Sequence, residues 1–455
     1  MSIVLKIGGS NLRDADSLRQ IYELIRSYKQ PVVLVVSAFN GLTDKLFEFV
    51  KETSKTADSI HNFLYELQSK YDSILLHEIT NRKLRDEVLD IYQARLSRLE
   101  DLLLGSSLIG GVPDFIEDEI VSFGERFSSL FISAYLRQRG IEIKELLPED
   151  IGFETNGSYH NASVNIEKSA LRLKNLDLSL SYVIPGFYGM SPDNKITVFG
   201  RGGSDYSAAA IAACLNASSL DVWKDVDGYL SGDPVRVSKP KKIQKLSYTE
   251  AAELSYFGAK ILHPRTVEPL KSLEIPIRIF NFKQTGSVPV PYTIIGPSGK
   301  ADDFGMKSVT FTEDIRTLTL RGAGVGITPG ILSKVTNTLE QGRVNIKSVI
   351  TTQVAISLLL SSSDLDVSHR LIEEMNIPGI DLIDESEELS LIAAVGEGIL
   401  DQPGIAASIF SAVARENINI KFISFGASRV AIYFLVGIKD RDIALNAIHN
   451  ELFCK

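Results

Sequence analysis

The sequence is poor in cysteine, in positive charge and in long apolar runs, and each shortage argues against a class of protein. Its two cysteines, Cys214 and Cys454, lie far apart in the sequence, so we do not expect a disulfide framework. We expect a reducing compartment, the cytoplasm. The formal net charge of -9 lacks the basic excess typical of nucleic-acid binding. No apolar run approaches the ~20 residues that a membrane-spanning helix requires.

The chain also lacks the signatures of several enzyme classes. It has no Walker A motif, no protein-kinase motif set and no Ser–His–Asp or Cys–His arrangement. Cysteine and histidine show no metal-ligand spacing, so no protein-bound metal is expected. The sequence begins directly with a predicted strand, and we therefore expect no signal peptide. A chain of 455 residues is long enough for about three domains.

One stretch, residues 197–209, reads T-V-F-G-R-G-G-S-D-Y-S-A-A and joins a predicted strand to an alanine-rich predicted helix. Its glycines allow a sharp turn and a close approach of the backbone to a ligand. Ser204 or Asp205 can cap the helix, whose N-terminus attracts anions. Arg201 adds a planar fork suited to a carboxylate or a phosphate. The stretch predicts an anion site, although a capped strand–helix connection without a ligand would show the same glycines.

Two further loops follow strands that the pattern predicts to be buried. Residues 2–7 read as a strand that ends beside Gly8 and Gly9, and residues 31–36 read as a second strand. Strands that alternate with helices predict a parallel sheet. The carboxyl ends of such strands form the crevice in which open α/β sheets bind ligands. Lys6 is therefore expected to point into a shared site, the alternative being an edge-strand lysine in solvent.

The last third of the chain contains an internal repeat. P-G-I at 329–331 recurs at 403–405, and N-I-K at 345–347 recurs at 419–421 with the same offset. Each unit reads strand, glycine-rich loop, helix and two strands, a βαββ pattern without a nucleophile or base. This pattern suits binding, regulation or oligomerisation better than chemistry. The Gly/Pro/Ser-rich segment 284–297 is expected to be the exit loop of the preceding domain.

Polar and charged side chains are predicted at the ends of several strands and at nearby helix starts. They are Lys6, Thr43, Glu125, Arg201, Ser204, Asp205, Asp225 and Lys260. Phosphoryl transfer needs such a set, because its barrier is lowered mainly by positioning and by positive charge on the transferring oxygens. Taken alone, the sequence around Glu125 favours a surface charge. His263, before a proline, is more often structural than catalytic.

A series of motifs in one order resembles the aspartate kinases of the amino acid kinase family. The motifs are K-I-G-G-S at 6–10, S-A-F-N-G-L-T at 37–43, F-G-E-R-F-S-S at 123–129, P-G-F-Y-G at 185–189, F-G-R-G-G-S-D-Y-S at 199–207, W-K-D-V-D-G from 223 and F-G-A-K-I-L-H-P at 257–264. The repeats resemble the tandem ACT domains of that family. The resemblance covers nearly the whole chain. It implies an α/β fold with an open αβα sandwich at 1–300, followed by two ferredoxin-like ACT domains at 313–385 and 388–455.

The resemblance implies transfer of a phosphoryl group from ATP, with Mg²⁺, to the side-chain carboxylate of L-aspartate, giving 4-phospho-L-aspartate on the route to lysine, threonine and methionine. By the same resemblance Lys6 and Asp205 are catalytic. The residues implied to hold aspartate are Thr43, Glu125, Arg201 and Ser204. Those implied to bind ATP are Gly8, Gly9, Lys224, Asp225, Tyr229 and Lys260. No dedicated metal site is implied, because Mg²⁺ would arrive with ATP.

The ACT domains imply feedback inhibition by an amino acid and assembly into a homodimer or a larger homo-oligomer. The residues implied at the effector site are Gly330, Asn345, Ile346 and Gln353. Lysine-inhibited relatives often carry an acidic residue where this chain has Lys347, so threonine, or weak regulation, is favoured over lysine. No fused homoserine dehydrogenase domain is expected after Lys455.

The chain departs from the family pattern at Lys224, where threonine is usual, and at Val235, where arginine is usual. The ATP side of the site is therefore less well supported by the resemblance than the aspartate side. Two alternatives stay open. One is a related kinase acting on glutamate or acetylglutamate, which would not usually carry tandem ACT repeats. The other is an amino-acid sensor with weak or no catalytic activity, against which the intact Lys6, Glu125 and Asp205 argue.

Overall fold

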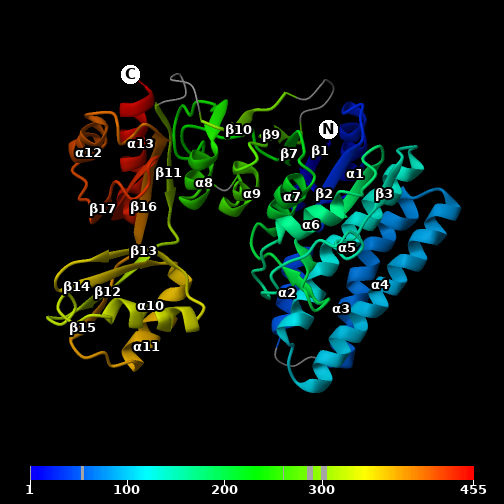
Figure 1. The fold of residues 1–455 in the computed structure, drawn as a ribbon, viewed down its shortest axis with the longest axis horizontal. Helices are drawn as coiled ribbons and strands as arrows, with labels where there is room; N and C mark the ends of the chain where they lie inside the picture. Colours follow the sequence, from blue (N-terminus) through cyan, green and yellow to red (C-terminus); the bar gives the residue numbers. More distant parts are fainter. Residues whose placement is uncertain (1, 53–55, 260, 284–289, 299–304, 455) are drawn as a thin grey trace. The chain divides into compact units, whose positions relative to one another are not determined.

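The computed structural model describes residues 2–52, 56–259, 261–283, 290–298 and 305–454, which fall into two compact units (Figure 1). Unit 1 comprises Met1–Tyr229, Lys242–Ser255 and Lys260–Lys300. Unit 2 comprises Leu230–Lys241, Tyr256–Ala259 and Ala301–Lys455. Two short segments from the first part of the chain therefore belong to unit 2. In the described part of the chain, no helix is long and apolar enough to cross a membrane.

Unit 1 is built on an eight-stranded sheet in the order β3-β4-β2-β1-β7-β9-β10-β8. Its strands are β1 (Ile3–Ile7), β2 (Val32–Val36), β3 (Ile143–Glu145), β4 (Ser181–Pro185), β7 (Ser219–Lys224), β8 (Lys245–Ser247), β9 (Ile277–Asn281) and β10 (Thr293–Gly296). The strands from β3 to β9 in this order run parallel, and β10 is antiparallel to β9. The central β2 is a continuous apolar run buried throughout, as parallel strands covered on both faces require.

The helices of unit 1 are α1 (Ala15–Ser27), α2 (Leu42–Lys51), α3 (Ala57–Glu78), α4 (Arg82–Ile109), α5 (Asp114–Gln138), α6 (Ile166–Leu173), α7 (Gly203–Cys214), α8 (Tyr248–Tyr256) and α9 (Glu268–Lys271). Leu5 and Ile7 of β1 point into the apolar core formed with α1–α5. Because side chains alternate along a strand, Lys6 points to the other face. There α7 packs on β1, β2 and β7. The ladder of β5 (Tyr188–Met190) and β6 (Ile196–Val198) leads into α7.

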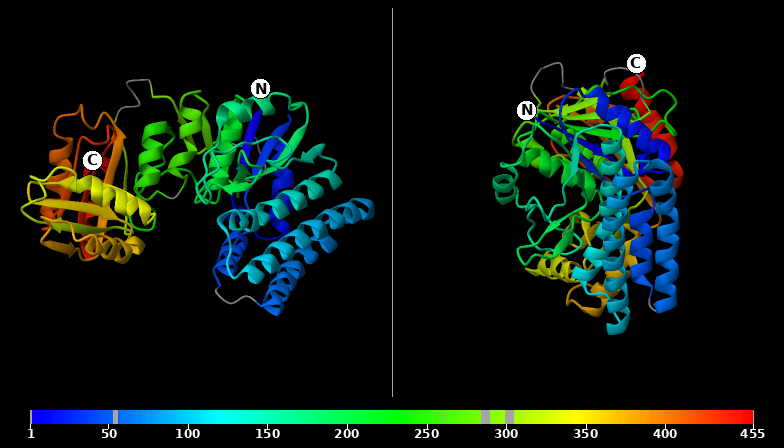
Figure 2. Two further views of the ribbon diagram at one scale, coloured as in Figure 1. Left: turned by 60° about the horizontal axis from the view of Figure 1, so that its bottom comes forward. Right: turned by 90° about the vertical axis from the view of Figure 1, so that its right-hand side faces the viewer.

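The layer formed by α3, α4 and α5, which lie side by side in Figure 2, has an aromatic core. The ring of Phe131 lies 5.3 Å from that of Tyr71 and 5.4 Å from that of Tyr92. Phe127 completes the group at 5.3 Å from Tyr92. These rings are all fully buried. They hold α5, which carries a proposed site residue, against the other long helices.

Unit 2 contains two four-stranded antiparallel sheets. The first repeat has β12 (Arg316–Arg321), α10 (Ile331–Gln341), β13 (Ile346–Thr351), β14 (Ala355–Leu360), α11 (Leu365–Glu374) and β15 (Leu382–Glu385). The second has β16 (Leu389–Glu397), α12 (Ile405–Arg415), β17 (Phe422–Ser424), β18 (Ala431–Gly437) and α13 (Arg441–Phe453), joined by β11 (Gly305–Thr312). Each repeat has its own buried apolar cluster.

Two strands differ from the sequence-based expectation. The prediction that 284–297 is only an exit loop is wrong, because β10 within it pairs with β9 and buries Thr293 and Ile295; residues 284–289 lie outside the described residues. β11 precedes the first repeat, yet it pairs with β16 of the second repeat. The expected boundaries at 313 and 388 therefore leave a strand of the second sheet outside both repeats.

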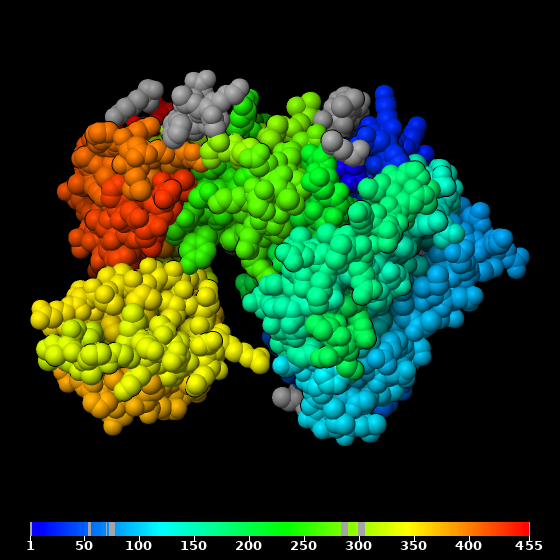
Figure 3. Space-filling model, viewed as in Figure 1, coloured from blue at the N-terminus to red at the C-terminus, as the bar shows by residue number. Residues whose placement is uncertain are grey.

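Truncation of the aromatic core tests this packing. Phe131→Ala should lower the free energy of unfolding of unit 1 by about 3–5 kcal/mol, the usual cost of a buried Phe cavity. The fluorescence of Trp223, the sole tryptophan and a β7 residue, reports this transition during urea unfolding. Leu108→Ala is the control, because Leu108 is 87% exposed on α4, whose outer side lies at the surface in Figure 3. Equal urea midpoints for Phe131→Ala and the control would contradict the packing.

Candidate active site

A carboxylate shared by two lysines lies at the carboxyl end of the central strands. Lys6 of β1 forms an ion pair with Oδ1 of Asp205, in the first turn of α7. The Nζ of Lys224, at the end of β7, lies 2.9 Å from Oδ2 of the same carboxylate. Lys6 and Asp205 are both buried. The sequence-predicted catalytic pair is therefore in contact, and Lys224 from the predicted ATP-binding set joins it.

The charges of this cluster shift one another's titration. Burial opposes ionisation of Asp205, but Lys224 and Lys6 outweigh it and hold the pKa of Asp205 well below its usual range. Burial lowers the pKa of Lys6, an effect that Asp205 partly offsets. Asp205 is therefore a fixed negative charge at any physiological pH, and it keeps the ammonium of Lys6 oriented.

Glu125, from the middle of α5, is buried beside this cluster. Its Oε1 accepts a hydrogen bond of 3.3 Å from Oγ of Ser204, and its Oε2 has no hydrogen-bond partner among the described residues. Burial raises the pKa of Glu125 to about 8, although bonds from the backbone of Ala38 and from Ser204 act against the shift. The surface-charge interpretation of Glu125 is therefore wrong. A buried carboxylate oxygen without a partner is a feature that a ligand's ammonium group would satisfy.

Close backbone approaches bring these side chains together. A Cβ on Gly186, after β4, would lie 2.9 Å from the Cβ of Ser204, so only glycine lets α7 start here. Gly202 is the N-cap of α7, with a φ of 70°, and it packs against His263, because a Cβ at this position would lie 2.3 Å from the histidine Cβ. His263 thus packs on the loop, as a structural residue would.

The two remaining residues predicted to hold aspartate are Arg201 and Thr43. Arg201 is exposed at the tip of the glycine loop, and no hydrogen bond or ion pair of its side chain is recorded in the described part of the chain. Thr43, in the first turn of α2, has its Oγ1 3.3 Å from the place of a Cβ on Gly124. It therefore lies next to the helix turn that carries Glu125. Arg201 is free to take a carboxylate from solution.

The residues predicted to bind ATP are more widely spread over the structure than those predicted to hold aspartate. Gly8 lies next to the Nζ of Lys6, and Gly9 next to the carbonyl of Ala38. Asp225 is exposed after β7. The side chain of Tyr229 is buried with its hydroxyl 3.3 Å from Oγ of Ser255, so it shapes the loop rather than facing solvent.

Thr293 fixes the end of that loop, because its Oγ1 accepts a hydrogen bond of 3.0 Å from the backbone N–H of Tyr229. β10, the strand that was not predicted, therefore supports the loop proposed for the nucleotide. Lys260 lies outside the described residues, so its placement stays a prediction.

Two supporting residues were not identified from the sequence. Buried Asp118 accepts backbone hydrogen bonds from His160 and from Val198, the latter of 2.9 Å, and burial raises the pKa of Asp118 to about 6. Arg265 donates to the carbonyls of Phe199 and Ala162. Together they hold the strand and loop before Gly200. The sequence could have identified Arg265, because it directly follows the motif F-G-A-K-I-L-H-P. Asp118 lies among other acidic residues of a helix, and nothing in the sequence distinguishes it from them.

The described side chains of the site offer few ligands for Mg²⁺, the cofactor that the resemblance implies. Among the described residues no group of three or more His, Cys, Asp and Glu side chains could hold a metal ion. Mg²⁺ commonly binds through substrate phosphates and water with one or two carboxylates. Mg²⁺ bound in this way needs no group of three protein ligands, so the described residues are compatible with Mg²⁺ that arrives on a nucleotide.

The proposed effector residues do not form one cluster within the chain. The backbone N–H of Gly326 donates a hydrogen bond of 2.9 Å to the carbonyl of Gln353. Gln353 therefore lies against the loop that ends at Gly330. Asn345 and Ile346 stand at the start of β13, and Gln353 follows its end. A strand rises about 3.3 Å per residue, so the length of β13 separates Asn345 and Ile346 from Gln353 and Gly330.

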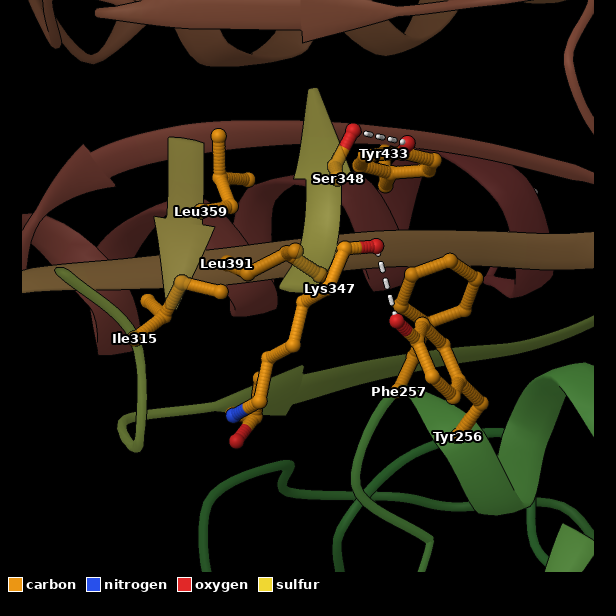
Figure 4. A pocket seen from close by; sticks show the side chains of 9 residues that line it. Tyr256, Phe257, Ile315, Lys347, Ser348, Leu359, Leu391 and Tyr433 are labelled. Carbon is orange, nitrogen blue, oxygen red and sulfur yellow. Dashed lines mark hydrogen bonds between the residues drawn. The ribbon is translucent and has the colours of Figure 1, made fainter. Parts of the chain in front are cut away.

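The start of β13 is held from two sides (Figure 4). The register of β13 shifts at Lys347, whose carbonyl is left to accept a 2.8 Å hydrogen bond from the hydroxyl of Tyr256. Oγ of Ser348 lies 3.2 Å from the hydroxyl of Tyr433. The cavity between them is ≈ 10 Å³, room for about one water molecule. The ammonium of Lys347 binds Asp314.

Comparison with known proteins agrees with this arrangement. Residues 1–281 match the amino acid kinase family, and residues 392–452 match the ACT domain. The chain is 30% identical over 468 residues to a bifunctional aspartokinase/homoserine dehydrogenase of Haemophilus influenzae, covering 99% of this chain and 56% of that protein. It is 29% identical over 471 residues to chloroplastic aspartokinase 2 of Arabidopsis thaliana, covering 100% and 84%. The chain spans about half the length of the bifunctional relatives it matches.

Solved structures extend the similarity to the fold of the whole chain. Escherichia coli aspartokinase III in complex with aspartate and ADP matches with a TM-score of 0.83 at 26% identity, covering 100% of both chains. The same protein in complex with lysine and aspartate gives 0.80 at 26% identity, covering 99% of both. The expected fold class, an αβα sandwich followed by two ACT domains, is confirmed.

The raised pKa of Glu125 predicts a pH-dependent stability. Between about pH 4.5 and pH 8 the folded chain holds a proton on Glu125 that the unfolded chain has lost, so the free energy of unfolding falls as pH rises through this window. Glu125→Gln cannot titrate. The difference in melting temperature, Glu125→Gln minus wild type, should therefore increase by a few degrees from pH 5 to pH 8. Both proteins are measured without ligand.

The control for this prediction is Glu48→Gln, at an exposed position of α2. It should follow the wild-type profile across the same pH range. Parallel melting profiles for the wild type and Glu125→Gln would show that Glu125 is ionised in the folded chain.

Proposed function

The chain belongs to the amino acid kinase family, and from this premise we propose that it transfers a phosphoryl group from ATP to the side-chain carboxylate of L-aspartate. The products are 4-phospho-L-aspartate and ADP, a first step toward lysine, threonine and methionine. Similarity to aspartokinases along the whole chain supports the assignment, and aspartate and ADP are the ligands of the E. coli structure. We propose a cytoplasmic enzyme, in line with its two unpaired cysteines.

One observation carries the choice of substrate: a buried carboxylate oxygen of Glu125 without a partner. The ammonium group of a free amino acid satisfies it, and an N-acetylated acceptor lacks that group. Arg201, exposed on the glycine loop, is suited to the α-carboxylate, with Ser204 and Thr43 nearby. These contacts favour an acceptor with a free ammonium and two carboxylates.

The chain's own groups then promote the transfer. Lys6 places its ammonium at the strand end, where negative charge develops on the transferring oxygens, and Asp205 orients it. The N-terminus of α7 adds a partial positive charge at the same place. Gly8 and Gly9 let the backbone approach the phosphates, and Asp225 with the loop to Tyr229 and Lys260 is proposed for the nucleotide. Bound Mg²⁺ would supply further charge neutralisation on the phosphates.

Acyl-phosphate trapping with hydroxylamine tests the function. The wild type should form the hydroxamate with ATP and aspartate, and little with glutamate or N-acetylglutamate. Arg201→Ala should raise the KM for aspartate about 10²-fold and that for ATP less than about threefold, because it removes a charge-assisted, bidentate contact to one substrate.

Arg172→Ala, on α6, is the matched control and should leave both constants unchanged. Equal increases in the two constants for Arg201→Ala would contradict its placement on the aspartate side. Turnover of glutamate or N-acetylglutamate in preference to aspartate would identify the related kinases. Binding of threonine or lysine without any turnover would identify a sensor.

We propose that the ACT repeats bind an inhibitory amino acid, threonine in preference to lysine, and that the chain assembles through them into a homodimer or larger oligomer. Lys347 places a cation beside Asn345 and Ile346, and the ion pair with Asp314 occupies the nearest carboxylate. β13, which carries these residues, is an edge strand that stays open to pairing. Lysine is a ligand of the E. coli protein.

Initial rates at subsaturating aspartate test the choice of effector. Threonine should inhibit more strongly than lysine at equal concentration. Lys347→Met removes the cation and frees Asp314 for a ligand ammonium, so lysine inhibition should increase about tenfold or more in this variant. Strong inhibition of the wild type by lysine alone would overturn the preference, and unchanged lysine inhibition in Lys347→Met would exclude Lys347 as its cause.

A further inference from the structure

Lys224 points to the same face of the sheet as Lys6. The two strands pair in parallel with Lys6 opposite Val222, and Lys224 is two residues further along β7. Because side chains alternate along a strand, Lys224 shares the face of Val222, over which the start of α7 lies. Its Nζ binds Oδ2 of Asp205, while Lys6 takes Oδ1. The side chain of Lys224 is still 16% exposed, so it remains accessible from the site.

The charge of this cluster depends on Lys224. Lys6 and Asp205 alone form a neutral pair, and the raised pKa of Glu125, about 8, leaves that carboxyl largely protonated at neutral pH. Adding the ammonium of Lys224 gives the three-residue cluster a formal charge of about +1. An unbalanced charge at a mostly buried position is unfavourable unless an anion completes it. The partial positive charge at the start of α7 adds to the imbalance.

We propose that Lys224 is a second cation for the phosphates handled in this site, the β-phosphate of the nucleotide and the phosphoryl group transferred from it, acting with Lys6 on either side of Asp205. This inference rests on the proposed kinase function. In the transfer, a carboxylate oxygen of the acceptor bonds to the γ-phosphorus, and the bond from that phosphorus to the bridging oxygen breaks. ADP leaves with the electron pair, and both lysines keep their protons. Positive charge at the transferring oxygens lowers this barrier.

A merely structural role, in which Lys224 only neutralises buried Asp205, is the alternative. It predicts lower thermal stability without any discrimination between ligands with and without phosphate. The two roles separate when binding of ADP is compared with binding of adenosine, which presents the same base and sugar without charge.

Lys224→Met removes the charge at similar length, and Lys224→Arg keeps it. By calorimetry, Lys224→Met should bind ADP about tenfold more weakly than the wild type and adenosine equally well. Its kcat for aspartate phosphorylation should fall about 10²-fold, with the aspartate KM changed less than about threefold. Lys224→Arg should regain most of both losses. Lys168→Met, which removes an exposed lysine paired with Glu154, is the control and should match the wild type.

Each outcome decides the inference. Equal ADP affinity and kcat in Lys224→Met and the wild type would overturn it, as would equal losses for ADP and adenosine, which indicate a damaged fold. Failure of Lys224→Arg to recover ADP affinity would also overturn it. If the wild type binds ADP but does not phosphorylate aspartate, the proposed substrate fails, while the comparison of ADP with adenosine still decides whether Lys224 faces the phosphates.

Discussion

A buried ammonium at the end of a central strand constrains the whole active site. Lys6 lies among apolar strands, and an ammonium there is unfavourable unless a carboxylate reaches it. Asp205 can do so only if α7 starts directly over the strand ends. The absence of side chains at Gly186 and Gly202 permits that start. The glycine loop thus serves two needs, because it brings the counter-charge to Lys6 and opens a helix N-terminus toward an anion.

The same constraint explains why the two sides of the site differ. On one side, Glu125 and Ser204 are fixed by α5 and α7, both packed on the sheet, so the side proposed for the acceptor is built on helices. On the other, the loop after β7 is held by hydrogen bonds to neighbouring segments: Tyr229 bonds Thr293 and Ile243, and Asp227 contacts Asn281 and Lys242. Rigid positioning of the acceptor is what phosphoryl transfer between two bound substrates requires.

Local patterns predicted much of the fold and of the site, and long-range pairing was where they failed. Residues 31–36 and 197–209 carry their structure in their own composition, so the parallel sheet and the glycine-rich turn into α7 follow from sequence. β10 and β11 do not, because each is defined by a partner strand that composition does not identify. In the same way the sequence nominates Glu125, but its burial depends on α5 packing against the 38–43 loop. The link between Lys224 and Asp205 likewise appears only in three dimensions.

The chain alternates between its two units before the repeats begin. Val237, from the first half, lies in the apolar core of the second repeat, and the backbone of Val309 in β11 donates to the carbonyl of Ser231. A gene fragment cut at a single point would leave one half without part of its core and the other with an apolar segment in water. The two units therefore cannot be separated by a single cut without exposing apolar surface.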